Sequence, residues 1–142
     1  MLDPHDLCRD YLAALETADL DAVSALFAAN GVVNSPLYGQ QDAREFYAAL
    51  FADTERSQTL LKRIYTAQDG SIALHFVYDW TMADGSPASF EVVDVIELDP
   101  DGTKIAALTI LYDTAPLRAT FEEARTTSPG PVGSGGADGG AR

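Results

Sequence analysis

The stretch SFEVVDVIELDPDGTKIAALTILYD, residues 89–113, decides the fold, because its pattern predicts two antiparallel strands joined by a turn. Strand side chains alternate between faces, so the apolar residues 90, 92, 96 and 98 share one face with Asp94. Glu91 and Glu97 fall on the other face, which predicts that this second face is the solvated one. A carboxyl in the middle of an apolar face needs a partner or its own proton, because burying it ionised and alone is prohibitive.

The chain before this stretch predicts two further strands, at residues 58–68 and 71–82, joined by the hairpin turn Asp69-Gly70. A second turn at 84–85 leads into the Asp94 strand, and the last strand is expected at 105–112. One face of the 71–82 strand carries an aromatic row, Phe76, Tyr78 and Trp80. These four strands form an antiparallel meander.

Three helices are predicted before the meander. Asp3-Pro4 is a typical helix start and the first helix runs to about residue 17. A shorter second helix buries Phe27 and is stopped by Asn30-Gly31, a short strand follows at 32–34, and the third helix covers 41–52. This order predicts an α+β class, a curved sheet with the helices on one side. We expect residues 1–126 to form one domain and the Gly-, Ser- and Pro-rich residues 127–142 to form a disordered tail.

Composition narrows the partners. The net charge of −13 would repel phosphate backbones and anionic lipids, so neither nucleic acid nor a membrane is expected as a partner. The single cysteine, Cys8, excludes an internal disulfide, and no apolar run is long enough to span a bilayer, so we expect a cytoplasmic protein. Two histidines and no glycine-rich phosphate loop predict neither a metal nor a cofactor.

Several short segments resemble a known superfamily in wording as well as in order: YLAAL at 11–15, DLD at 19–21, ALFA at 25–28, REFY at 44–47, and residues 102–112. They are similar to the nuclear-transport-factor-2-like proteins, which include ketosteroid isomerases, SnoaL-like polyketide cyclases and limonene-epoxide hydrolases. The resemblance covers residues 5 to about 122. It implies a cone-shaped, curved antiparallel (mixed) sheet with three N-terminal helices around a small-molecule pocket.

The resemblance to ketosteroid isomerases also implies roles for individual residues. Their oxyanion hole pairs a helix-1 tyrosine with a protonated aspartate, which fall on Tyr11 and Asp94 here. A supporting helix-3 tyrosine falls on Tyr47, and Phe27 stands where some isomerases have a further tyrosine. The general base would fall on Ser35, and a serine cannot shuttle a proton between carbons as a carboxylate does.

SnoaL-like cyclases and the epoxide hydrolases use a carboxylate on the last long strand, where this chain has apolar or aromatic residues and Asp113 only at the end. The predicted catalytic pair is therefore Tyr11 and Asp94. Tyr47, Asp113 or a water near Ser35 are the candidates for proton transfer. The predicted pocket residues are Phe27, Ser35, Tyr47, Phe76, Trp80, Leu108, Ile110 and Tyr112.

Two functions stay open. One is an isomerase, cyclase or hydratase/epoxide hydrolase that acts on a hydrophobic polyketide-, terpenoid- or steroid-like carbonyl compound, with a neutral Asp94 and Tyr11 polarising an oxygen. The other is a non-catalytic binding or dimerisation module, in which Asp94 is satisfied by Tyr11 or the backbone. On the opposite sheet face, His75 and Asp79 indicate an ion pair at a surface rather than catalysis. A homodimer is predicted through that face, formed by Ala73, His75, Val77, Val93, Val95 and Thr109.

Overall fold

The computed structural model describes residues 2–115 and 122–123, so the predicted tail at 127–142 and the predicted domain boundary lie outside the described residues. The described chain folds as three helices and one six-stranded sheet. The elements in chain order are α1 (Pro4–Thr17), α2 (Leu20–Ala25), β1 (Phe27–Ser35), β2 (Gly39–Asp42), α3 (Ala43–Ala52), β3 (Thr54–Thr66), β4 (Ile72–Met82), β5 (Pro87–Leu98) and β6 (Ile105–Leu111).

Each helix begins at an aspartate whose side chain accepts a backbone N–H of the first turn. Asp3 caps α1, Asp19 caps α2 and Asp42 caps α3. These contacts satisfy donors that a helix start otherwise leaves without an intrahelical partner, and a carboxylate also interacts favourably with the helix dipole. The sequence therefore determines where each helix starts through the position of an aspartate.

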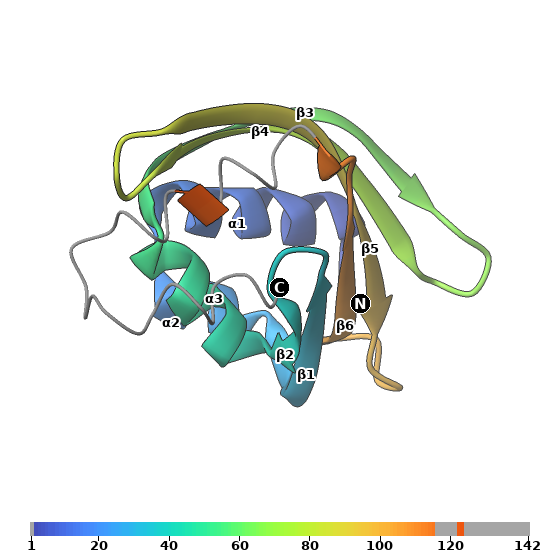
Figure 1. Cartoon of the computed structure of the whole chain (residues 1–142). Helices are drawn as coiled ribbons and strands as arrows, with labels where there is room; N and C mark the ends of the chain where they lie inside the picture. The colour runs from blue at the N-terminus through green and yellow to red at the C-terminus, as the bar shows by residue number, and fades with distance from the viewer. Residues whose placement is uncertain (1, 116–121, 124–142) are drawn as a thin grey trace.

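The sheet has the strand order β2-β1-β6-β5-β4-β3. β1 runs parallel to β6, and all other neighbours are antiparallel, so the sheet is mixed. It is curved and unclosed, and β3 and β4 arch over α1 (Figure 1). The predicted α+β class, with a curved sheet and three helices, is confirmed.

The prediction for the second helix was wrong at its C-terminal end. α2 stops at Ala25, and Phe27 begins β1, where it pairs with Ile105 of β6. Gly31 lies within this strand and is no helix stop, since a Cβ there would lie 2.9 Å from the Ile105 carbonyl oxygen. The glycine admits a close backbone approach between β1 and β6. The apolar spacing through Phe27 resembled a helix because the strand is irregular there, with a register shift before Val32.

Two other elements differ from the prediction. β3 begins at Thr54, four residues before the predicted start, and ends at Thr66. β2, a short polar edge strand of sequence GQQD, had no apolar alternation that could predict it. Both differences lie at sheet edges, where pairing with a neighbour decides the structure more than local propensity does.

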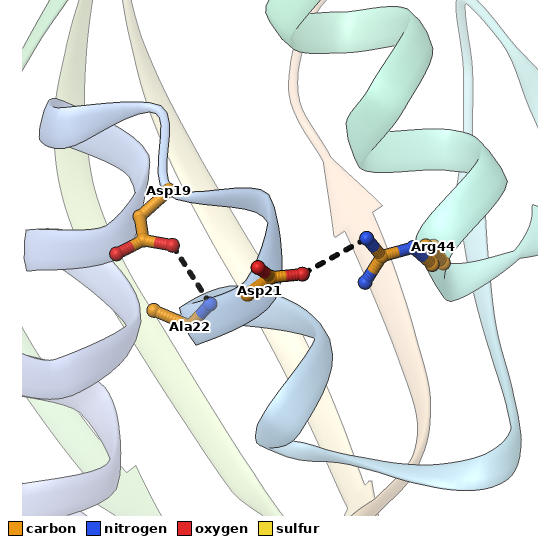
Figure 2. A network of polar contacts seen from close by, with 4 residues as sticks. All are labelled: Asp19, Asp21, Ala22 and Arg44. Atoms are coloured by element: carbon orange, nitrogen blue, oxygen red, sulfur yellow. Dashed lines mark hydrogen bonds and ion pairs between the residues drawn. The ribbon is translucent and has the colours of Figure 1, made fainter.

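A polar network joins α2 to α3 on the surface (Figure 2). Arg44 Nη2 lies 2.9 Å from Asp21 Oδ1, and Asp19 caps the start of α2 through the Ala22 N–H. The side chains of the ion pair are 55% and 88% exposed, so the pair orients the two helices but contributes little stability.

The core lies between the concave face of the sheet and the helices. On β5, Val92, Asp94 and Ile96 are buried, whereas Glu91 and Glu97 are exposed, which confirms the predicted alternation. In the part of the chain that the structure describes, no helix is long and apolar enough to cross a membrane.

Candidate functional site

A cavity opens between the inner face of the sheet and helices α1 and α3. Its volume is about 50 Å³. Among its lining residues, Asp94 is the one carboxyl group, and none is basic. Aromatic side chains dominate the walls. The lining residues are Tyr11, Leu15, Ser35, Leu37, Tyr38, Phe46, Leu50, Phe76, Tyr78, Trp80, Phe90, Val92, Asp94, Ile110 and Tyr112.

Asp94 lies at the centre of β5, paired with Leu74 of β4 on one side and Ile110 of β6 on the other. It is 1% exposed, and its Oδ1 atom has no hydrogen-bond partner among the described residues. Burial raises the pKa of Asp94 from its ordinary 3.8 to about 8, and the neighbouring Tyr11 hydroxyl opposes part of that rise. The carboxyl is therefore largely protonated at pH 7 and can donate a hydrogen bond.

The hydroxyls of Tyr11 and Tyr47 lie 2.7 Å apart in the core. The sequence places Tyr11 on the buried stripe of α1 and Tyr47 on that of α3, so their meeting joins the two helices. Burial raises the pKa of both hydroxyls well above the usual value for tyrosine, and the nearby Asp94 carboxyl adds to both rises. Both tyrosines keep their protons, and Tyr11 reaches the cavity while Tyr47 stands behind it.

The wall opposite α1 is a row of aromatic rings. Tyr78 packs edge-on against Phe90, with ring centres 5.8 Å apart, and Phe90 stacks on Tyr112 at 4.6 Å. The indole N–H of Trp80 donates to Thr54 Oγ1 at 2.8 Å, so this large ring is oriented by a polar contact as well as by packing. The row provides an apolar wall of aromatic rings that are tilted or edge-on to one another.

Ser35 has a structural role at the rim of the cavity. Its Oγ atom accepts the backbone N–H groups of Leu37 and Tyr38, both at 3.2 Å, and so shapes the turn after β1. Tyr38 donates its hydroxyl to Asp53 Oδ2 at 2.7 Å, which ties this turn to the end of α3. The residue at the position of the isomerase base therefore holds a loop in place.

The structure brings most of the predicted site residues together. Tyr11, Ser35, Phe76, Trp80, Asp94, Ile110 and Tyr112 line the cavity. Phe27, Tyr47 and Leu108 do not line it; they are packed in the core one layer behind, with the ring centres of Phe27 and Tyr47 5.8 Å apart. Asp113 is exposed, and its carboxylate accepts the Ala115 N–H.

Several residues that line the cavity were not among the predicted pocket residues. Phe90 and Val92 were on the inward face of the Asp94 strand, and Tyr78 was in the aromatic row, so the alternation could have found them. Leu37 and Tyr38 gave no periodic signal, because they lie in an irregular turn. Their placement depends on the contacts of Ser35 and Asp53.

Within residues 2–115 and 122–123, no three histidine, cysteine, aspartate or glutamate side chains lie together as metal ligands would. Cys8 is buried, and burial raises the pKa of its thiol to about 11, with the Asp94 carboxyl adding to the rise. A thiol in that state is a poor nucleophile and a poor metal ligand.

The chain belongs to the SnoaL-like domain family, whose sequence model matches residues 8–108. A search among proteins of curated function gave no match. The match explains the fold and the presence of a pocket, whereas chemistry within such a family depends on the individual site residues.

Solved structures with this fold include proteins of several kinds. One, from Catenulispora acidiphila, has a ketosteroid isomerase-like fold and was solved in complex with trimethylamine; it is 17% identical, with a TM-score of 0.71, over 82% of this chain and 92% of that one. TerC, co-crystallised with polyporic acid, is 13% identical with a TM-score of 0.70, over 84% and 98% of the two chains. SalBIII, an epoxide hydrolase/cyclase-like enzyme of pyran-ring formation in salinomycin, is 18% identical with a TM-score of 0.66, over 78% and 90%.

The arrangement limits what the site can do. A neutral carboxyl and a tyrosine hydroxyl in an apolar cavity can donate hydrogen bonds to an oxygen that gains negative charge. The described lining residues offer no ionised carboxylate at neutral pH to act as a strong base. The site is therefore better equipped to polarise a carbonyl than to remove a proton.

Proposed function

We propose that this protein binds a small hydrophobic carbonyl compound and polarises its oxygen with Asp94 and Tyr11, as an enzyme of the isomerase, cyclase or hydratase type. The observation that carries this proposal is Asp94 itself, a buried carboxyl with an unpartnered oxygen, facing a cavity of aromatic walls. A buried polar atom without a partner costs stability, so its presence in a cavity is a reason to expect a ligand there.

The cavity walls are largely apolar, and a ligand that fills the cavity leaves little room for water beside Asp94. Donors that are fixed in an apolar cavity interact strongly with a developing oxyanion, because no water competes and no reorganisation is needed. Removing one such donor from an enzyme typically costs roughly 3 kcal/mol of transition-state stabilisation. Asp94 meets the requirement as long as it keeps its proton, and its pKa of about 8 allows that at pH 7.

The test is ligand binding as a function of pH. Acetophenone and ethylbenzene differ in one carbonyl oxygen, and we expect the wild type to prefer acetophenone below pH 7 and to lose that preference as the pH rises through about 8. Asp94→Leu should keep only the part of this preference that comes from Tyr11, and what remains should not change as the pH rises through 8. Carbon NMR of the Asp94 carboxyl gives the protonation state directly, and an ionised Asp94 at pH 6 would overturn the donor role.

A second candidate is a non-catalytic binding module, which the serine at position 35 favours, because that residue supplies no carboxylate. The aromatic lining with one acidic group also suits a small organic cation, and the similar protein from Catenulispora acidiphila was solved in complex with trimethylamine. Tetramethylammonium separates the two ligand classes, since its affinity should rise above pH 8, where Asp94 ionises, while acetophenone affinity falls. Turnover of 3-cyclohexen-1-one to its conjugated isomer separates enzyme from binding module.

The proposal includes a homodimer formed through the outer face of the sheet. Six partly exposed residues of β4, β5 and β6 form a continuous patch there, because their registers place them side by side. Leu111, 52% exposed, extends the patch. An apolar surface of this kind is typical of an interface, and a twofold dimer is the commonest way to cover it. The patch residues are Ala73, His75, Val77, Val93, Val95 and Thr109.

The proposed location is a reducing cytoplasm, because Cys8 is a free thiol.

A further inference from the structure

The lining of the cavity divides into a buried part and a partly exposed part. Along β5, Asp94 is 1% exposed and Val92 is 3% exposed, whereas Phe90 is partly exposed. Exposure therefore increases along the inner face of this strand from Asp94 toward Phe90, so the cavity opens at the Phe90 end and Asp94 lies inside it. The partly exposed lining residues, which we call the mouth, are Ser35, Phe90, Ile110 and Tyr112.

The space inside the mouth is small. The cavity volume is about 50 Å³, whereas an engineered apolar cavity that holds one benzene molecule has roughly 150 Å³. One water needs about 10–15 Å³ of such a volume, so the cavity has room for roughly four non-hydrogen atoms. Because protein interiors are close-packed, admitting a whole ring would require buried side chains such as Val92 to move. The cavity fits a carbonyl group and the carbons directly bonded to it.

Aromatic rings stand at the mouth. The rings of Phe90 and Tyr112 have centres 4.6 Å apart, and their planes are tilted by 33°. Phe90 precedes Asp94 by four residues on the same face of β5, which places the two backbone positions roughly 13 Å apart. That separation leaves room for a small group beside Asp94 and for a larger apolar body against the two rings. Aromatic rings at partly exposed positions are well suited to stacking on such a body.

We infer that the ligand enters by a small carbonyl head that reaches Asp94, while its larger body stays at the mouth against Phe90 and Tyr112. The head is the carbonyl group with its directly bonded carbons, as in an aryl methyl ketone. The inference rests on the proposed function for the contact with the carbonyl oxygen, and adds the size limit of the head and the place of the body. Carbonyl compounds that are branched next to the carbonyl are disfavoured, because the branches would have to enter the cavity.

Three aryl ketones test the two size limits, with dissociation constants from NMR titration of the full-length protein at pH 6.5. 2-Acetylnaphthalene enlarges the body of acetophenone, and we expect it to bind about fivefold more tightly, because it covers more apolar surface at the mouth. Pivalophenone has a tert-butyl group in place of the methyl group and should bind about tenfold more weakly, although it is more apolar. Weaker binding of 2-acetylnaphthalene than of acetophenone would overturn the inference, and so would pivalophenone binding as tightly as acetophenone.

The orientation of the bound ligand can be measured in the same samples. With acetophenone bound, the nuclear Overhauser effects of the acetyl methyl group should be strongest to the Val92 methyl groups. Those of the ring proton opposite the acetyl group should be strongest to the rings of Phe90 and Tyr112. The reverse pattern would place the aromatic ring inside the cavity and would contradict the inference.

Variants on either side of Asp94 locate the limit on the head. Val92→Ala widens the cavity beside Asp94 and should recover at least threefold of the affinity that pivalophenone loses. Ile96→Val is the matched control, because Ile96 is buried on the same face of β5 but is not among the lining residues. It should leave the loss unchanged. A folded Val92→Ala that keeps the full loss, or an Ile96→Val that removes it, would show that the space beside Asp94 does not limit the head.

The proposed function and this inference fail separately. Equal affinities for acetophenone and ethylbenzene, with 2-acetylnaphthalene still preferred and pivalophenone still rejected, would remove the donor role of Asp94 and leave the size limits standing. A clear preference for acetophenone over ethylbenzene, together with rejection of 2-acetylnaphthalene, would keep the donor role and overturn the placement of the body at the mouth.

Discussion

Titratable side chains on the two faces of β4 and β5 lie in opposite environments. On the outer face, His75 Nε2 lies 2.7 Å from Glu91 Oε1, with the two side chains 26% and 65% exposed. On the inner face, Asp94 is 1% exposed and has an unpartnered oxygen. The outer pair costs little to maintain, since water solvates both groups, whereas the inner carboxyl is a stability cost that packing does not explain. A ligand-binding role explains that cost, and the comparison can be tested by substitutions on either face.

The largest difference in stability is expected between two variants that place a carboxylate at adjacent positions of β5, one on the inner face and one on the outer face. Val92 lies on the inner face and is 3% exposed, so Val92→Asp buries a second carboxyl there. We expect the free energy of unfolding to fall by roughly 3–5 kcal/mol, with unfolding near room temperature. Val93→Asp lies on the partly exposed outer face and should leave the monomer fold intact. Circular dichroism with thermal melting measures both.

The same pair of variants tests the dimer. Sedimentation should find the wild type as a dimer at tens of micromolar and Val93→Asp as a folded monomer, because the new charge would be buried in the interface. A monomeric wild type would contradict the proposed dimer. A dimeric, fully stable Val93→Asp would show that this face is not the interface.

The inner face could be predicted from sequence more fully than its surroundings. Alternation in residues 90–98 gave the burial of Asp94 and the exposure of Glu91 and Glu97, because period two is a direct consequence of strand geometry. The Tyr11–Tyr47 contact and the role of Ser35 could not be read in that way, since they depend on how α1, α3 and the turn after β1 meet. The outer ion pair was expected at His75, but its partner is Glu91 of the next strand, a residue that only the register identifies.

The second effect in size is the pH dependence of stability due to Asp94. The pKa of this carboxyl is about 8 in the folded protein and near 3.8 when unfolded, so the folded state binds one more proton between these pH values. The contribution of the protonated Asp94 to the free energy of unfolding is therefore fully present below about pH 4 and is lost as the pH rises through 8. Relative to Asp94→Asn, which cannot ionise, the wild type should lose up to about 1.4 kcal/mol per pH unit across that window.

Urea unfolding of wild type and Asp94→Asn between pH 5 and 9 measures this difference, and the subtraction removes the titration of the other acidic groups. Glu91→Gln serves as a matched control from the outer face, because it removes a carboxyl from the same strand. A wild-type-minus-variant difference for Asp94→Asn that is flat with pH would mean that Asp94 has an ordinary pKa in the folded protein.

A smaller change is expected at Ser35, at the rim of the cavity. Ser35→Ala removes the acceptor for two backbone N–H groups and should cost about 1 kcal/mol of stability. Ser35→Asp keeps an acceptor in the turn, adds a carboxylate beside the cavity, and should raise the isomerisation rate of 3-cyclohexen-1-one by about a hundredfold, the lower end of the effect of a general base. The gain should vanish in an Asp94→Leu background, and a gain that survives there would remove Asp94 from the reaction.

The smallest effect is expected from the ion pair on the outer face. Glu91→Gln removes the charge that faces His75 but leaves a side chain of the same shape, so the monomer should lose about 0.2–1 kcal/mol, and less at 1 M salt than at low salt. Measuring this in the Val93→Asp background keeps the protein monomeric and separates the pair from the interface. A loss above 2 kcal/mol would mean that the outer pair is shielded from water like the inner carboxyl. The contrast between the two faces would then come from pairing and not from exposure to solvent, because Oδ1 of Asp94 has no hydrogen-bond partner among the described residues, whereas His75 is paired with Glu91.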